Sequence, residues 1–397
     1  MSPTRVNCGF LPLVDCAPLV LARELGFASD EGLDLRLVKA KSWAAVRDKL
    51  ALGVLDAAQM LSPTPIAMSL GLGGMPTRID ALSVLSVNGD VIGVSPALAD
   101  AMRAQGPNGG APTLGEEAAE VGRRLIAAAP KPLTIGVPFP FSMHAELLTY
   151  WLGALGLRQP EDLRVRTIPP PAMPKAVAAG EIDAFCVGEP WGSLAAAAGV
   201  AELALPGAAI WGFAPEKVLA VSHAWIHGNA ETVGPLLRAV WRAGRWLGDP
   251  NNAMTAAEFL SRAAYVGVSA EVIERTLRGR MLVSPSLGER ATPRLVEFFD
   301  GAATFPWRSQ AIWIAVRLAE RNGIDPETAA QVARDCFRTD LYRATLGPIG
   351  ADLPAASEKL EGALLARTAV ASSVGEMYLG PDRFFDGKIF DPKDWGR

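Results

Sequence analysis

Two tryptophans are the side chains whose type and position first suggest ligand binding. Trp43 follows Ser42 and Trp191 follows Pro190, which puts both indoles in the first turn of an expected helix, because serine caps helices and proline fits their first positions. An indole offers one N–H donor and no acceptor, so it complements an anion better than a cation. Hydrophobic packing is the simpler interpretation of either tryptophan taken alone.

A histidine and a lysine could make further polar contacts to the same kind of ligand. His144 precedes an amphipathic run, so its imidazole is expected at a helix N-terminus, where unpaired N–H groups favour anions. Lys217 lies just before an apolar run of strand length. Taken singly, a structural histidine and a solvated surface lysine are the alternatives.

The sequence carries no familiar catalytic or cofactor motif. It has no GxSxG, P-loop, GxGxxG or HExxH pattern, its four cysteines form no CxxC pair, and its three histidines complete no zinc site. We therefore expect reduced, buried thiols, no metal, no cofactor and no catalytic residue. An enzyme remains an alternative, with His144 or Cys16 as the reactive group.

Strand-like and helix-like runs alternate through the first half of the chain. This alternation is typical of βαβ units and predicts an α/β fold with mainly parallel sheets. Beyond Thr232 the pattern becomes mostly helical, with Trp241, Trp246 and Phe259 on buried faces. The predicted strands are 6–10, 33–38, 82–87, 133–137 and 163–168, and the predicted helices are 17–25, 44–52, 145–155 and 175–179.

The runs 50–63 and 177–190 share one pattern. Each has a glycine at a helix end (Gly53, Gly180), then an aspartate (Asp56, Asp183), a short apolar strand and a proline. The pattern predicts one equivalent unit in each of two lobes, and chance similarity of two alanine-rich segments is the alternative. At 397 residues the chain is long enough for two lobes.

Composition and charge exclude several classes of protein. Half of the residues are hydrophobic and the net charge is −4, so neither general disorder nor direct nucleic-acid binding is expected. The apolar stretch 184–214 is interrupted by Glu189, Pro190, Glu202 and Pro206, so no membrane span is expected. The sequence passes from Met1 into the apolar run 6–13 without room for a secretory signal, which favours a cytoplasmic location. A surface loop is expected at 105–115.

In open α/β sheets, ligands bind beyond the carboxyl ends of the strands. The segments in such positions are 12–18, 42–43, 62–65, 138–144 and 188–191. Together they would form a cleft suited to a small anion.

Read together, these segments resemble the nitrate-binding family of substrate-binding proteins, relatives of the bicarbonate and sulfonate binders of ABC transporters. The elements that carry the resemblance are Gly-Phe-Leu-Pro-Leu-Val-Asp-Cys-Ala-Pro at 9–18, Ser-Trp at 42–43, Ser-Met-His at 142–144, Gly-Glu-Pro-Trp at 188–191, Pro-Glu-Lys at 215–217 and Phe-Pro-Trp-Arg-Ser-Gln at 305–310.

The resemblance implies a type II periplasmic-binding-protein-like fold, with two α/β lobes, a ligand cleft between them and extra C-terminal helices. The first lobe would take residues 1–92, the second 93–207, and the chain would return to the first over 208–397. The implied ligand-binding residues are Trp43, Asp90, His144, Gly188, Trp191 and Lys217. A lysine at 217 favours an oxyanion held without metal, whereas Asp90 stands where nitrate binders usually have an uncharged amide.

The absence of a signal also favours resemblance to the cytosolic branch of this family. That branch implies a nitrate or nitrite sensor, which holds an RNA-binding transcription antiterminator when ligand-free and releases it when the anion binds. The first alternative is the substrate-binding protein of an ABC transporter for nitrate or a related oxyanion. The second is an enzyme on the same two-lobed fold.

Overall fold

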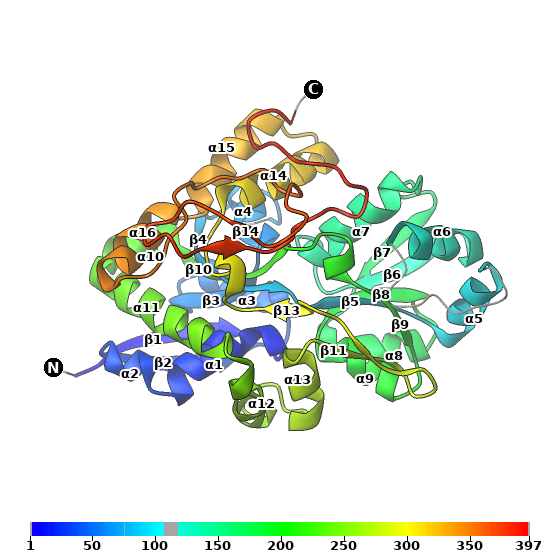
Figure 1. Cartoon of the computed structure of the whole chain (residues 1–397), viewed down its shortest axis with the longest axis horizontal. Coiled ribbons are helices and arrows are strands. Elements are labelled where there is room, and N and C mark those ends of the chain that lie inside the picture. Colours follow the sequence, from blue (N-terminus) through cyan, green and yellow to red (C-terminus); the bar gives the residue numbers. More distant parts are fainter. Residues whose placement is uncertain (1, 75, 107–117, 396–397) are drawn as a thin grey trace.

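Two β-sheets, one in each lobe, organise the computed structural model, which describes residues 2–74, 76–106 and 118–395 (Figure 1). The six-stranded sheet of the first lobe has the order β13-β4-β10-β3-β1-β2, and the five-stranded sheet of the second has the order β7-β6-β8-β5-β9. The first sheet contains β1 (Thr4–Phe10), β2 (Leu33–Lys39), β3 (Ala57–Leu61), β4 (Ile79–Asn88), β10 (Pro215–Ser222) and β13 (Val296–Glu297). The second contains β5 (Asp90–Val94), β6 (Leu133–Val137), β7 (Leu163–Thr167), β8 (Ala184–Gly188) and β9 (Glu202–Pro206).

Helices cover both sheets. The second lobe has α5 (Pro96–Ala104), α6 (Ala118–Ala128), α7 (Met143–Ala154), α8 (Met173–Ala178) and α9 (Trp191–Ala197). The first has α1 (Ala17–Glu24), α2 (Phe27–Asp30), α3 (Trp43–Ala51), α4 (Pro63–Ser69) and, after the chain returns, α10 (His223–Gly228), α11 (Ala230–Leu247), α12 (Ala253–Ser261), α13 (Ala270–Leu277), α14 (Arg308–Asn322), α15 (Pro326–Cys336) and α16 (Thr339–Leu346). Helix α11 buries Val233, Leu236, Leu237 and Val240, a helical spacing that gives it one apolar face.

Both sheets are mixed, so the prediction of mainly parallel sheets was wrong. In the first lobe β1 pairs in parallel with β2 and β3, but β10 runs antiparallel to β3 and β4. In the second lobe β6 is parallel to β7 and β8, but β5 runs antiparallel to β8 and β9. Strands β5 and β10 each enter their sheet from the other lobe, so no βαβ crossover fixes them parallel to their neighbours.

The repeated sequence pattern corresponds to one repeated structural unit. In the first lobe Asp56 Oδ2 accepts the N–H of Asn7 at 2.8 Å, which ties the start of β3 to β1. In the second, Asp183 Oδ2 accepts the N–H of Thr134 at 2.8 Å, which ties the start of β8 to β6. Gly53 and Gly180 both have a positive φ, as expected for residues that end a helix. The prediction of an equivalent unit in each lobe is confirmed.

Asn88 ties together the segments that cross between the lobes. It is the last residue of β4, two residues before β5 begins, and its φ of 59° lies in the left-handed region. Its amide nitrogen donates to the carbonyls of Gly212 (3.3 Å) and Arg294 (3.1 Å), and its oxygen accepts from the N–H of Ala214 at 3.2 Å. One side chain therefore holds three interlobe connections in place.

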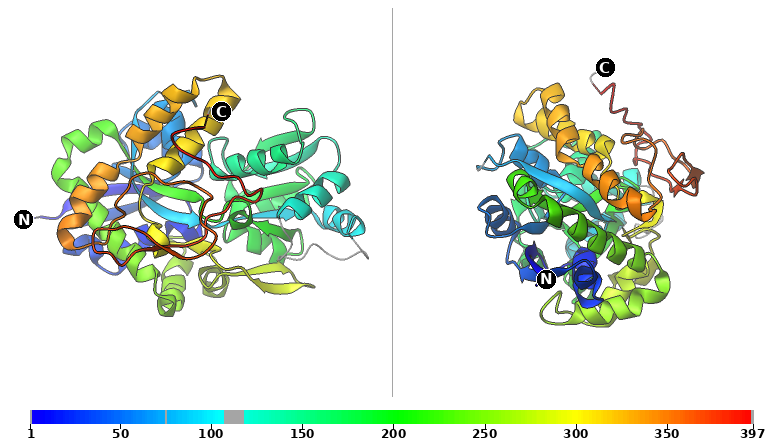
Figure 2. Two further views of the ribbon diagram at one scale, coloured as in Figure 1. Left: turned by 45° about the horizontal axis from the view of Figure 1, so that its top comes forward. Right: turned by 90° about the vertical axis from the view of Figure 1, so that its left-hand side faces the viewer.

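The C-terminal segment 350–395 contains no helix among its described residues, so the expected helical C-terminal region ends at α16 and the short turn after it. Glycines and prolines interrupt the segment, at Gly350, Pro354, Gly362, Gly375, Gly380, Pro381, Gly387 and Pro392. Its only strands in the described part are β14 (Thr368–Ala369) and β15 (Tyr378–Leu379). Figure 2 shows this segment running along one face of the first lobe and on toward the second.

Aromatic contacts fasten that segment to both lobes. Phe384 stacks on Trp211, with ring centroids 4.8 Å apart, and meets Tyr150 of α7 at 5.4 Å. The hydroxyl of Tyr150 donates to Asp386 at 2.8 Å.

A hairpin of β11 (Arg280–Ser284) and β12 (Gly288–Ala291) also reaches the second lobe and contacts α9 and β9. The predicted loop at 105–115 falls mostly outside the described residues.

None of the described helices combines the length and the apolar character that a membrane crossing requires.

Candidate functional site

Lys217 occupies the centre of a polar cluster between the lobes. It lies on β10, opposite Leu61 of β3 and Ser86 of β4, and it is completely buried. Its Nζ lies 2.8 Å from Asp15 Oδ2 and 2.6 Å from Glu216 Oε1. The same nitrogen is 5.5 Å from the centroid of the Trp43 ring. Lys217 is thus a strand residue in the core and not the solvated surface lysine that was the alternative.

Asp15 belongs to the first lobe and is held by a second buried polar side chain. It lies in a short 3-10 turn (Val14–Cys16) that leads into α1. Gln59 of β3 donates to Asp15 Oδ1 and accepts the N–H of Leu11 at 2.9 Å. Burial raises the pKa of Asp15, although Lys217 and Gln59 favour its charged form. This carboxylate is therefore oriented toward Lys217 before any ligand is considered.

His144 brings the second lobe to the same cluster. It is in the first turn of α7, whose N-terminus Ser142 caps by accepting from the N–H of Ala145. His144 Nδ1 lies 3.2 Å from Glu216 Oε1, and the imidazole is completely buried. Burial, together with the charge of Lys217, holds the pKa of His144 well below its usual value. The imidazole is accordingly neutral at neutral pH, and Lys217 is the cation of the cluster.

Gly188, at the end of β8, permits the lobes to meet. A Cβ at this position would lie 2.6 Å from Leu13 Cδ2, 3.6 Å from Asp15 Oδ2 and 3.8 Å from His144 Nε2. Directly beside it, the N–H of Val14 donates across the lobes to the carbonyl of Glu189 at 2.9 Å. A side chain at 188 would therefore occupy the space between the lobes.

Asp90 faces the cluster from β5, directly across from Gly188 on β8. It is buried, and the thiol of Cys186 donates to Asp90 Oδ2 at 3.3 Å. Gly207 packs against the carboxyl group, since a Cβ there would lie 2.2 Å from Asp90 Oδ1. Burial raises the pKa of Asp90, although Cys186 and Lys217 oppose this shift.

Trp191 takes a different position from the other predicted site residues. It begins α9 as expected, but it is only half-buried, and its Nε1 donates to the carbonyl of Pro12 at 2.9 Å. This bond links the two lobes. The expected use of the indole N–H as an anion donor is therefore not seen, because a backbone carbonyl already accepts it.

Several buried polar atoms around Lys217 make no hydrogen bond to any described residue: the donors Trp43 Nε1, Ser62 Oγ and Ser86 Oγ, and both ring nitrogens of His144, one of which carries the proton. Ser86 is paired with Lys217 in the sheet, and Ser62 directly follows its other partner, Leu61. Leaving polar groups unpaired in a protein interior is costly, so such a group of donors marks a place for a ligand with several acceptors. Donors beside an ammonium group suit a small oxyanion.

Two functional candidates, Asp15 and Glu216, were not predicted from the sequence. Asp15 does stand out as a charge within the otherwise apolar run 10–22, and Glu216 adjoins Lys217. Burial raises the pKa of Glu216 to about 8, with Lys217 opposing and Asp90 reinforcing the shift.

Cys16 gives no support to the enzyme alternative. Its thiol is buried, and burial together with the neighbouring Asp15 raises its pKa, which disfavours the reactive thiolate. Among the described residues no group of three or more histidine, cysteine or carboxylate side chains is arranged to hold a metal ion.

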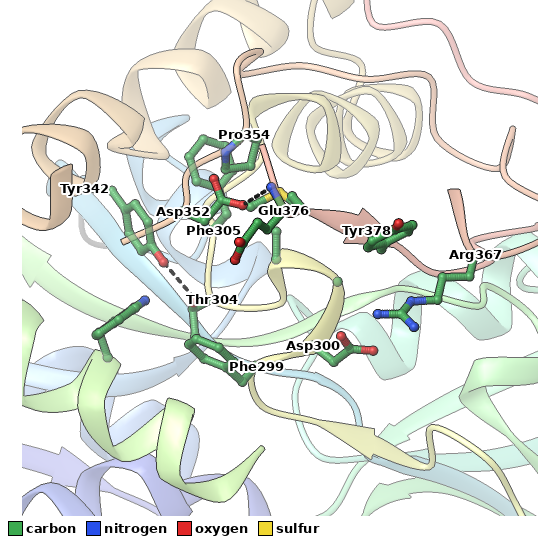
Figure 3. Close-up of a pocket in the computed structure, with 14 residues that line it drawn as sticks. Phe299, Asp300, Thr304, Phe305, Tyr342, Asp352, Pro354, Arg367, Glu376 and Tyr378 are labelled. Carbon is green, nitrogen blue, oxygen red and sulfur yellow. Dashed lines mark hydrogen bonds between the residues drawn. The ribbon is translucent and has the colours of Figure 1, made fainter. Parts of the chain in front are cut away.

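A separate hollow lies between the C-terminal segment and the first lobe (Figure 3). Its wall includes Tyr342, which is hydrogen-bonded to Thr304 at 2.6 Å. Its charged lining residues are Arg367 and three carboxylates, Asp300, Asp352 and Glu376. The cluster between the lobes, where a buried ammonium group lies beside unpartnered donors, remains the candidate site for an anion.

The two lobes and the buried site between them define a periplasmic-binding-protein-like fold, as solved relatives also show. A family model described as NMT1-like matches residues 1–261, and the chain belongs to this family. The expected fold class is confirmed.

Several curated relatives and one solved relative have nitrate-related names, and other curated relatives are named as bicarbonate transport ATP-binding proteins. The chain is 33% identical over 346 residues to the nitrate import ATP-binding protein NrtC of Synechocystis, covering 85% of this chain and 49% of that one. It is 28% identical over 400 residues to the nitrate/nitrite binding protein NrtA of Nostoc, covering 98% and 83%. The crystal structure of the periplasmic nitrate-binding protein NrtA from Synechocystis matches with a TM-score of 0.83 and 26% identity, covering 98% and 96%. The chain spans about half the length of the NrtC proteins that it matches.

Proposed function

We propose that this protein binds nitrate or nitrite between its lobes and is the ligand-binding component of a nitrate uptake system. The observation that carries the proposal is the buried ammonium of Lys217 among unpartnered donors, including Trp43 Nε1 and Ser86 Oγ. A small oxyanion has acceptors in several directions, and charge-assisted hydrogen bonds to it contribute about 1.5–3 kcal/mol each. The names of the NrtA and NrtC relatives support this choice of anion.

Binding requires the lobes to move. Trp43, His144 and Lys217 are at most 3% exposed, and the bond from Trp191 to Pro12 crosses directly beside them. An anion can reach them only when the lobes separate, and it then adds contacts to both lobes when they close. The ligand thus favours the closed form by its differential affinity for that form.

The partner in this role is a membrane transporter with an ATP-binding subunit. The NrtC relatives, named as ATP-binding proteins of nitrate import, support this partner because about half of their length matches the chain. A transporter has to recognise the closed, loaded form, so anion binding should strengthen its interaction with the protein.

A cytoplasmic nitrate or nitrite sensor is the second candidate, and it rests on the sequence resemblance to the cytosolic branch. In this role the partner is an RNA-binding antiterminator, held by the ligand-free form. The coupling between anion binding and partner binding then has the opposite sign. Linkage requires the anion to weaken the complex by the same factor by which the partner weakens anion binding.

Calorimetric titration with nitrate, nitrite, sulfate and bicarbonate, the last with and without calcium, tests the ligand. We expect binding of nitrate or nitrite without metal, and the bound anion should raise stability by about 2.7 kcal/mol at a hundredfold excess over Kd. Binding of bicarbonate only with calcium, or of none of these anions, would overturn the proposal. Pull-down by an antiterminator that nitrate reverses would favour the sensor over the transporter component.

A further inference from the structure

Three carboxyl groups share the buried site with one ammonium group. Asp15 and Glu216 contact Lys217 directly, and Asp90 lies close enough to influence Lys217 and Glu216 electrostatically. If all three were ionised, the cluster would carry an excess of negative charge even with Lys217 protonated. Adding an anion to such a site is strongly unfavourable, because like charges repel most where water is excluded.

We propose that Asp90 is a neutral carboxylic acid in the ligand complex and donates its proton in a hydrogen bond to the anion, so that, above the pKa of Asp90 in the free protein, each bound anion brings one proton into the site. This inference rests on the proposed function. It makes Asp90 a binding residue whose proton, and not its charge, contacts the ligand.

The contacts distinguish Asp90 from the other two carboxyl groups. Asp15 and Glu216 each lie within 2.8 Å of the ammonium group of Lys217, so each already has a charged partner inside the protein. Among the described residues, the thiol of Cys186 is the only side-chain donor to Asp90, and a thiol is a weak donor. Its Oδ1 is buried and makes no hydrogen bond to any described residue. This oxygen is therefore the place for a proton that a ligand can accept.

The surroundings of Asp90 also favour the neutral form. Cys186 of β8 stays a thiol, since burial and Asp90 itself keep its pKa well above the usual value. From the first lobe, Asp15 raises the pKa of Asp90 and Lys217 lowers it. The net direction is upward because burial is the largest cause. His144, at the N-terminus of α7, is neutral and adds no charge.

The position on the sheet directs Asp90 toward the ligand. Directly opposite residues of neighbouring antiparallel strands place their side chains on the same face. Asp90 is opposite Gly188, whose missing side chain would point at Asp15 and His144. Asp90 therefore shares the face of the second sheet that is turned to the site.

The wild-type protein provides the first test. Nitrate binding is measured by calorimetry from pH 5.5 to 8.5 in buffers of different ionisation enthalpy, which gives the number of protons taken up. Because the protonated form binds, affinity is full below the pKa of Asp90 in the free protein and falls above it, by up to about tenfold per pH unit. Uptake approaching one proton per anion at the pH values where affinity falls supports the proposal. Proton release on binding, or an affinity that rises with pH, overturns it, because either would show that the ionised carboxylate is the form that binds.

Two variants locate the proton. Asp90→Asn keeps the shape and supplies an N–H donor without titrating, so it should lose proton uptake and bind nitrate more tightly than the wild type at pH 8.5. Glu216→Gln changes the other strongly shifted carboxyl and should keep the proton uptake. The opposite result, with uptake kept in Asp90→Asn and lost in Glu216→Gln, would assign the proton to Glu216. Failure of the wild type to bind nitrate at every pH would instead refute the proposed function.

Discussion

The two lobes share one repeated unit, yet they present different chemistry to the site between them. Strands β3, β1 and β2 of the first lobe correspond to β8, β6 and β7 of the second, and each set receives an antiparallel strand that comes from the other lobe. Lys217 on β10 is opposite Leu61, the last residue of β3, and Asp90 on β5 is opposite Gly188, the last residue of β8. Equivalent positions therefore carry a cation in one lobe and an acid in the other.

The difference shows where the specificity of such a site is set. The first lobe contributes a preformed ionic group, in which Lys217 is already paired with Asp15 and Glu216. The second contributes the neutral imidazole of His144, the space at Gly188 and the carboxyl of Asp90. The shared fold positions both sets in the same way, and single side chains make the lobes complementary.

Removal of the cation is expected to have the largest effect. Lys217→Met leaves Asp15 and Glu216 buried without their partner, which should cost about 3–5 kcal/mol of stability and abolish nitrate binding. Lys359→Met is the matched control, because Lys359 is also nearly buried and contacts two carboxylates, Glu361 and Asp382, far from the site. Denaturant unfolding and calorimetry should show comparable losses of stability but retained binding in the control. Equal binding by both variants would place Lys217 outside the ligand site.

The second effect is a change of stability with pH, to which one buried glutamate from each lobe contributes. Burial raises the pKa of Glu216 to about 8 and that of Glu189 to about 7, despite its bonds to Ser193. Between an unfolded-state pKa of about 4.3 and these values the folded protein binds more protons than the unfolded chain. Stability should therefore fall as pH rises, by up to about 1.4 kcal/mol per unit for each group.

Denaturant unfolding of the ligand-free protein from pH 5 to 8.5 measures this fall. Glu216→Gln should flatten the curve up to about pH 8, and Glu189→Gln only up to about pH 7. A wild-type curve that rises over this range would show that the two carboxyl groups are ionised in the folded state.

The smallest effect compares the paired aspartates. Asp56 accepts hydrogen bonds from the backbone and side chain of Asn7 and from Trp225 Nε1, whereas Asp183 accepts from the N–H of Thr134. Asp183→Ala should cost about 1–3 kcal/mol, for one buried donor left unpaired, and Asp56→Ala should cost more. Urea denaturation of both variants tests which of them loses more stability. The reverse order would mean that the two units do not depend on this bond in the same way.

The regular elements were predictable because local patterns determine them. Alternating apolar runs placed β1, β2, β6 and β7 within two residues of their observed ends, and Ser42 does cap its helix as predicted. The direction of β5 and β10 was not predictable, since it follows from the crossing between the lobes and not from any local pattern. The non-helical segment beyond α16 was missed even though its glycines and prolines were visible.

The site was predictable in its residues more than in its contacts. Trp43, His144, Gly188 and Lys217 lie together, and Asp90 faces them, as the resemblance implied. That Trp191 would bond to Pro12, or that Lys217 would be shared by two carboxylates, depends on how closely the lobes approach. Such distances arise from packing over the whole chain, so no single sequence motif predicts them.

The position of β10 has a consequence for the order in which the protein folds during synthesis. β10 lies between β3 and β4, so the sheet of the first lobe stays divided until residues 215–222 have left the ribosome. All strands of the second lobe, β5 to β9, are made before that point, so its sheet can form first. The strand that joins these two parts of the sheet is also the one that carries Lys217. The nascent chain therefore buries its central charge in the same step that joins the two halves of the sheet, when Asp15 is already present to receive it.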